Sequence, residues 1–211
     1  MTNRKKDKRL IKGRQTRQEV LSAAIDIITG EGIDQVSASK ISAMIGTSKS
    51  NVFYHFKTRD AILRGVYQYI FDELKASFIL KETDFKTYMM NLGQSLFDHP
   101  EDLPMYKAFF AFYNVGLFDE TFRDMLKEST EGILDLIEEQ LSFFVEQRGF
   151  ESDGKREEIK VVAMGILCFI DGAGLHYLLN PSLPYLQETW NNQILMWEMN
   201  LFSSGDHYEK F

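Results

Sequence analysis

The stretch that decides the fold is Ser37–Leu63, SASKISAMIGTSKSNVFYHFKTRDAIL. Two short segments with apolar residues at helical spacing flank Gly46-Thr47-Ser48. Gly46 is predicted to end the first helix, because glycine reaches left-handed backbone angles at little cost. Ser48 is predicted to start the second, because its hydroxyl can accept from free backbone N–H groups. A helix, a tight turn with glycine and a second short helix form a helix-turn-helix motif.

The second helix of this motif has one face for the core and one for solvent. Val52, Phe53 and Phe56 are predicted to be core, with Phe56 packed on the helix that carries Val20 and Ile27. The remaining side chains are suited to contact DNA. In protein–DNA complexes, contacts to phosphates position the protein on the duplex, and contacts to base edges recognise the sequence.

The candidate DNA-binding residues are polar or basic and lie in or beside the motif. Lys49, Tyr54, His55 and Lys57, with Ser39 and Lys40, are candidates for phosphates. Ser50 and Asn51 are candidates for base edges, since asparagine suits adenine N6 and N7. Thr47 in the turn completes the set. The alternative is that all of them are ordinary solvated positions.

Charge is divided unevenly along the chain. Residues 1–65 hold 13 Lys and Arg against 6 Asp and Glu, whereas residues 66–211 hold 11 against 25. The net charge of −7 therefore conceals a basic head of +7 and an acidic body of −14. This split favours a nucleic-acid partner for the head alone.

The N-terminal segment carries seven basic residues and one Asp between Asn3 and Arg14. Residues 1–12 are expected to form a flexible arm. Such an arm could enter a minor groove or remain a solvated tail with only general attraction to the duplex. Deleting it is expected to weaken binding and to flatten its salt dependence.

The rest of the chain indicates an all-α protein, because no strand-like alternation persists and only four prolines occur. About nine helices are expected, at 16–29, 37–45, 48–54, 58–80, 84–98, 103–114, 119–148, 152–180 and 183–202. Thr58 is expected to cap the fourth. Residues 1–57 are assigned to a DNA-binding head and 58–211 to a helical body, with the helix 58–80 joining them.

Compartment and membrane association follow from composition. A single cysteine, Cys168, permits no intrachain disulfide and favours a reducing cytoplasm. The most apolar run, Val161–Leu179, contains Asp171 and His176 and is interpreted as a buried soluble helix rather than a membrane span.

The head resembles that of the TetR family of bacterial transcriptional regulators. The resemblance rests on IGTSKSNVFYHFKTRDAIL, with its glycine turn, aromatic pair, His-Phe and Lys, and covers about Gln15–Leu63. Phe53 stands where the family often has Tyr, Thr47 where it has an apolar residue, and Ser50 where it has Gly. These departures argue against a familiar operator sequence.

The resemblance implies that residues 58–211 are a regulatory and dimerisation domain, with an effector pocket in the first body helices and a dimer through the last two. Large adaptable side chains suggest a largely apolar ligand, and the candidate residues are Phe71, Met90, Gln94, Phe109, Phe112, Tyr113, Phe122, Met125 and Asp171. Glycines inside a helix and an apolar last helix suggest close helix packing across a dimer. The candidate interface residues are Gly165, Gly172, Gly174, Trp190, Ile194 and Trp197.

The protein is therefore predicted to be a ligand-responsive DNA-binding regulator. It is expected to be a cytoplasmic homodimer that represses transcription from a palindromic operator. A small apolar or aromatic effector is expected to release it from that operator. No catalytic residues, metal ligands or cofactor motifs are predicted, and no membrane partner. Catalytic activity is disfavoured, because the four histidines of the chain are scattered along the sequence. The alternative is a helical small-molecule carrier or interaction protein without sequence-specific DNA binding.

Overall fold

The computed structural model describes residues 2–79, 84–97 and 103–203. Nine α-helices and two 3-10 helices make up the described part, which contains no strand, so the all-α prediction is confirmed. The elements are α1 (Thr2–Glu31), η1 (Ile33–Gln35), α2 (Ala38–Met44), α3 (Lys49–His55), α4 (Arg59–Phe78), α5 (Phe85–Phe97), α6 (Leu103–Phe118), α7 (Glu120–Gln147), η3 (Asp153–Lys155), α8 (Arg156–Leu179) and α9 (Leu186–Phe202).

The chain forms two compact units. The first contains Met1–Glu73 and Asp102–Arg123, and the second contains Leu74–Glu101 and Asp124–Phe211. The helix α6 thus packs with the N-terminal helices, although it follows α5 in sequence. The functional boundary between residues 57 and 58 is a separate matter and stays a prediction.

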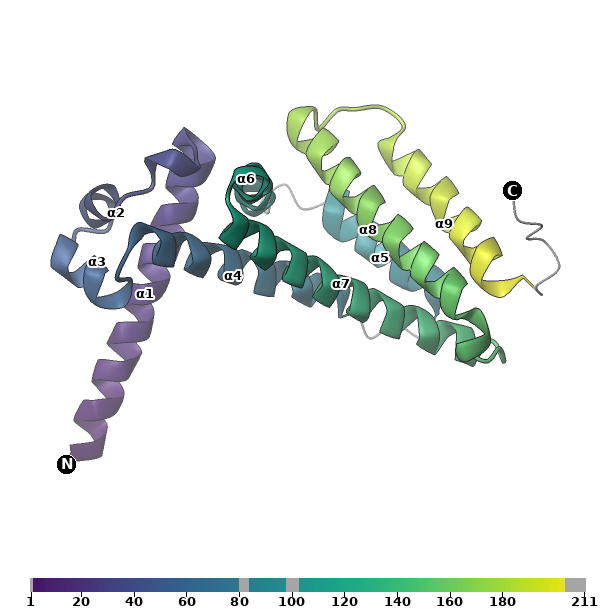
Figure 1. The fold of residues 1–211 in the computed structure, drawn as a ribbon, viewed down its shortest axis with the longest axis horizontal. Coiled ribbons are helices and arrows are strands. Elements are labelled where there is room, and N and C mark those ends of the chain that lie inside the picture. The colour runs from purple at the N-terminus through teal and green to yellow at the C-terminus, as the bar shows by residue number, and fades with distance from the viewer. Residues whose placement is uncertain (1, 80–83, 98–102, 204–211) are drawn as a thin grey trace. The chain divides into compact units, whose positions relative to one another are not determined.

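The head of the first unit is built on the second half of α1 (Figure 1), against which α2 and α3 pack. Val20, Ile27, Ile41 and Val52 are almost fully buried there. Phe56 is also buried, with the Arg17 guanidinium 4.6 Å from its ring centroid, so the prediction that it packs on this helix is confirmed.

An aromatic cluster joins α4 to α6 within the same unit. The Tyr67 ring stacks on Phe71 and Phe109, with both centroid distances at 6.2 Å, and meets the edge of Phe112 at 5.3 Å. The Lys107 ammonium on α6 donates to the Thr29 carbonyl near the end of α1 at 2.5 Å. A cation at this position satisfies a free carbonyl and complements the helix dipole.

The second unit packs α9 against α5 and α8. The Trp190 indole N–H donates to the Met89 carbonyl on α5 at 3.1 Å, and Trp197 lies over Gly165 on α8. Phe169 contacts both tryptophan rings, at centroid distances of 5.2 and 6.1 Å. These aromatic contacts fix α9 to its neighbours within one chain.

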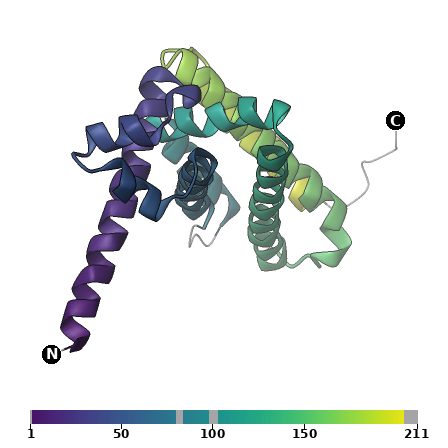
Figure 2. The ribbon, with the colours of Figure 1, turned by 60° about the vertical axis from the view of Figure 1, so that its left-hand side comes forward.

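The beginning of the chain differs from the expectation of a flexible arm. Residues 2–12 continue α1 as regular helix, and in Figures 1 and 2 this part of α1 projects past α2 and α3. Once residues 16–31 are helical, each added residue avoids the cost of nucleation. Lysine and arginine are also good helix formers.

One helical stretch in the described residues, Asp153–Leu179, is long and apolar enough to cross a membrane by length and composition alone. Only 33% of its most apolar window is buried within the chain. The sequence predicts that this helix is buried on several sides. It is buried on the side that faces α5 and α9, whereas an apolar outer side is exposed.

Candidate nucleic-acid interface

The turn of the helix-turn-helix has the predicted geometry. Gly46 has a φ of 65°, in the left-handed region, and ends the first helix of the motif. The Ser48 hydroxyl accepts from the Asn51 backbone N–H at 3.1 Å and begins α3. The Ser37 hydroxyl caps α2 in the same way, and Thr58 caps α4 through the Ala61 N–H at 3.0 Å. Local capping therefore sets the boundaries of α2, α3 and α4.

Arg59 is a further positioning residue, which sequence reasoning missed. Its Nε donates to the Val36 carbonyl at 3.0 Å, and its Nη2 donates to the Ile33 carbonyl at 2.8 Å. The planar guanidinium can reach both carbonyls at once. Arg59 thus ties the start of α4 to the segment that enters α2. The one sequence signal for this role is its position directly after the capping residue Thr58.

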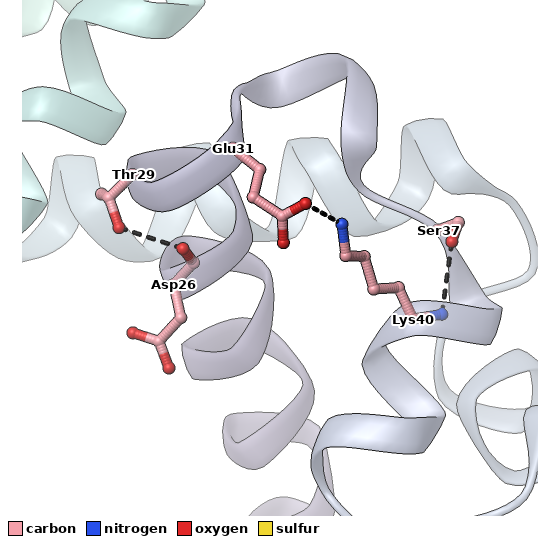
Figure 3. Close-up of polar contacts among 5 residues, drawn as sticks. All are labelled: Asp26, Thr29, Glu31, Ser37 and Lys40. Carbon is pink, nitrogen blue, oxygen red and sulfur yellow. Dashed lines mark hydrogen bonds and ion pairs between the residues drawn. The ribbon is translucent and has the colours of Figure 1, made fainter.

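Lys40 is engaged within the head (Figure 3). Its ammonium pairs with the Glu31 carboxylate at the end of α1, while its backbone N–H donates to the Ser37 hydroxyl. This candidate phosphate ligand must leave Glu31 before it can bind DNA. Since the pair is partly solvated, its loss costs little.

The solvent face of α3 brings together most of the predicted residues. Lys49, Ser50 and Tyr54 are exposed there, and Tyr54 keeps 73% of its surface accessible. The Asn51 amide Nδ2 donates to the Thr47 hydroxyl at 2.9 Å, which fixes the orientation of the amide. Thr47 therefore positions the predicted base-reading side chain.

The C-terminal end of α3 adds an aromatic and basic group. The rings of Tyr54 and His55 meet edge to face at 5.2 Å, and the Lys57 ammonium lies 5.8 Å from the Tyr54 ring centroid. Ser39 is exposed near the start of α2. Ser39, Tyr54 and Lys57 are open to solvent, whereas His55 is half-buried, as are Thr47 and Asn51.

Phe53 does not lie in the core, so that part of the sequence prediction is wrong. Val52 is fully buried, but Phe53 keeps 43% of its surface exposed on the α3 side that carries Lys49. Neighbouring residues of a helix differ by about 100° in direction, and the core reaches only Val52 and Phe56. An aromatic side chain on a recognition helix is suited to contact a thymine methyl group.

The predicted effector residues are divided between the two units. Phe71, Phe109, Phe112 and Phe122 are buried in the aromatic cluster of the first unit, with Tyr113 half-buried at its edge. Met90 and Gln94 are exposed, whereas Met125 and Asp171 are half-buried, all in the second unit. The effector set stays a prediction.

The predicted dimer residues lie mostly inside one chain, and the dimer interface stays a prediction. Trp190, Ile194 and Trp197 are no more than 5% exposed within a single chain, and a Cβ on Gly165 would lie 2.9 Å from the Trp197 indole nitrogen. Gly174 is buried as well. Of the six predicted positions, only Gly172 is exposed, with open space where a Cβ would be.

A different apolar surface is open on the second unit. It consists of Val161, Met164, Cys168, Gly172, Leu175 and Leu179 on α8 and of Leu195, Met196 and Met199 on α9. The α8 members recur every three or four residues and so share one face. We call this set the outer face. Two surface depressions border it, one lined by Glu157, Val161 and Asn200 and the other by Arg148, Leu195 and Met199.

Known proteins similar to this chain are transcriptional regulators. Residues 20–66 match the family model described as bacterial regulatory proteins, tetR family. The HTH-type transcriptional regulator BetI of Vibrio vulnificus (strain YJ016) is 21% identical over 172 residues, which cover 79% of this chain and 82% of BetI.

Solved structures agree in fold. A transcriptional regulator from Rhodococcus sp. Rha1 superposes with a TM-score of 0.71 at 19% identity, over 87% of this chain and 96% of that chain. A protein from Saccharomonospora viridis, described as a transcriptional regulator and crystallised in complex with choline, has a TM-score of 0.65 at 18% identity, over 88% and 96% of the two chains.

A capped helix-turn-helix in a chain whose described secondary-structure elements are all helices defines a DNA-binding transcriptional regulator. Members of this class read DNA with the second helix of the motif, which here is α3. The family whose model the head matches is the TetR family of bacterial regulators.

Proposed function

We propose that this protein is a cytoplasmic homodimeric repressor that places α3 of each subunit in the major groove of a palindromic operator. The observation that carries the proposal is the solvent face of α3, where Asn51 is held by Thr47 beside exposed Lys49 and Ser50. In a two-fold dimer, the two recognition helices would meet half-sites about 34–36 Å apart.

The contacts at each half-site divide into two kinds. Ser50, Asn51 and Phe53 meet base edges, with Asn51 suited to adenine and Phe53 to a thymine methyl group. Lys49, Tyr54, His55 and Lys57 hold phosphates, with Ser39 and Lys40 at the side of the site. The acidic body repels the duplex, so that binding is confined to the head.

The homodimer forms through the outer face. An apolar stripe along α8 and three apolar residues on α9 are exposed in one chain, and contiguous apolar surface of this kind marks an interaction site. A two-fold axis beside α8 would bury the stripe against its own copy. The substitution Met196→Glu is expected to yield monomers by light scattering, whereas Met90→Glu, at 53% rather than 54% exposure, leaves the dimer intact.

A small, largely apolar effector releases the protein from its operator. The relative crystallised with choline supports a small-molecule ligand for this fold, and the buried aromatic side chains of Phe71, Phe109 and Phe112 are the candidate apolar lining. Release requires that the effector bind more tightly to the arrangement that does not fit the operator. The helix α4, which contributes to both units, is the element that carries the change.

The test is fluorescence anisotropy with DNA from upstream of the protein's own gene. Asn51→Ala and Phe53→Ala are each expected to weaken specific binding about 10-fold or more, in line with about 1–3 kcal/mol per base contact. Phe143→Ala is the matched control, because Phe143 on α7 is also 43% exposed. If the unaltered protein binds neither the upstream DNA nor genomic DNA better than a random duplex, the repressor hypothesis is wrong. The alternative, a helical small-molecule carrier, then replaces it.

A further inference from the structure

The N-terminal part of α1 is helical ahead of the residues that form the core of the head. From Leu10 onward, the first buried residue of α1 is Val20, and Leu10 and Ile11 are 54% and 65% exposed. A Cβ on Gly13 would lie 3.9 Å from the His55 ring, at the C-terminal end of α3. Residues 2–12, called the basic extension below, therefore leave the head beside the end of the recognition helix (Figure 2).

The charge of the basic extension opposes its own helix. Six of its eleven residues are Lys or Arg, Asp7 is its one acid, and no acid lies in the first turn. The N-terminus of a helix carries a positive partial charge, so cations there are unfavourable. Like charges three or four residues apart add repulsion. A polyanion lying along the extension would remove both penalties.

The shape of the basic extension limits how it can meet DNA. An α-helix with side chains is about 10–12 Å across, whereas the minor groove is about 6 Å wide. A helical extension cannot enter that groove, in contrast to a flexible arm. Its length of about 16 Å, at 1.5 Å per residue, matches about five phosphates of one strand at 3.4 Å spacing.

From these observations we infer that the basic extension is a helical clamp on the phosphate backbone of the duplex that flanks each half-site. The inference rests on the proposed function, since the recognition helix brings the extension to DNA. The contact is independent of sequence. Binding to the flank neutralises the extension and stabilises its helix, so affinity and helicity rise together.

The experiment compares two operator probes, one trimmed at the half-sites and one with about 10 additional base pairs of random sequence, roughly one helical turn, at each end. The full-length protein is expected to bind the flanked probe at least about 10-fold more tightly, with a salt slope steeper by about 0.9 for each added phosphate contact. Far-UV circular dichroism at 222 nm is expected to gain helical signal with the flanked probe only.

Three variants separate charge from helix. In Lys5→Gln/Lys6→Gln/Lys8→Gln/Arg9→Gln four of the six cations are lost and helix propensity is retained, so most of the advantage of the flanked probe should disappear. The control removes four cations elsewhere, at Lys86, Lys127, Arg156 and Lys160, and should keep the advantage. Ile11→Pro keeps every charge but breaks the helix, and should lose most of the advantage.

The outcomes are distinct. Equal binding of both probes by the unaltered protein overturns the clamp but leaves the repressor intact, whereas failure to bind either probe refutes the repressor itself. An undiminished advantage in Ile11→Pro assigns the effect to a flexible arm and overturns the helical clamp. Because Leu10 and Ile11 are exposed, anionic phospholipid vesicles are a third arm. Tighter binding to them than to the flanked probe would assign the extension to membrane surfaces and overturn the inference.

Discussion

The substitution Gly93→Ala tests how α9 is held to α5. A Cβ at this position would lie 2.1 Å from the Trp190 indole nitrogen and 2.7 and 2.8 Å from two ring carbons. The ring cannot move aside freely, because its N–H donates to the Met89 carbonyl one turn earlier on α5. Gly93 thus provides the space that allows the buried indole to reach the helix backbone.

The expected magnitude follows from three contributions. Alanine in place of glycine stabilises a helix by up to about 1 kcal/mol. Overpacking costs about 1–3 kcal/mol, and a buried indole N–H left without its acceptor costs about 1–3 kcal/mol more. We therefore expect Gly93→Ala to lower the free energy of unfolding by about 2–4 kcal/mol. Urea unfolding at fixed protein concentration measures it, since dimerisation adds to apparent stability.

Two comparisons make this expectation specific. At Gly132 on α7, a Cβ would have nothing within 4 Å of it, so Gly132→Ala should leave stability unchanged or raise it by up to about 1 kcal/mol. In a Trp190→Phe background the indole nitrogen is gone, and Gly93→Ala should cost clearly less. The reasoning is refuted if Gly93→Ala behaves like Gly132→Ala, or if its cost is the same in both backgrounds.

Three further predictions concern the head and the start of α5. Gly46→Ala should cost about 1–2 kcal/mol because of the positive φ, and Gly46→Asn should cost less; equal thermal stability of the two variants would contradict this. Arg59→Lys should lower stability by about 1 kcal/mol, because an ammonium cannot hold both carbonyls as the guanidinium does; an unchanged urea midpoint would count against this role of Arg59. The backbone N–H of Thr87 holds the pKa of Asp84 below its ordinary value of 3.8. The ionised carboxylate therefore stabilises the folded state above the ordinary pKa, and this stabilisation is lost as the pH falls through the lowered pKa. Asp84→Asn should keep the helix cap at neutral pH and flatten the fall in stability on the acid side, as followed by thermal melts from neutral to strongly acidic pH.

Local features of the motif could be predicted from the sequence because their causes lie within a few residues. Ser48 accepts from a backbone N–H three residues later, and Gly46 adopts its left-handed angle next to the helix it ends. Burial of Val52 and Phe56 follows from their spacing of one helical turn. Phe53 could not be placed in this way, because the width of the buried stripe depends on how closely α1 and α2 approach α3.

The tryptophans show a second limit. An apolar last helix with glycines opposite it predicts close packing, but the same pattern serves packing within a chain and packing between chains. The structure uses Gly93 and Gly165 to receive Trp190 and Trp197 inside one subunit. This leaves the opposite side of α8, with Met164 and Leu175, as the open apolar surface.

The sequence alone determined the helix-turn-helix, the all-helical class and the division of charge between head and body. Each depends on local spacing, capping or composition, which the order of residues contains directly. Only the tertiary structure decided that Phe53 faces solvent, that Trp190 is internal, and that α1 continues to Thr2 as a projecting helix. Those features depend on contacts between residues far apart in the chain, or on the absence of such contacts, and helical periodicity is the same whether a face is buried or open.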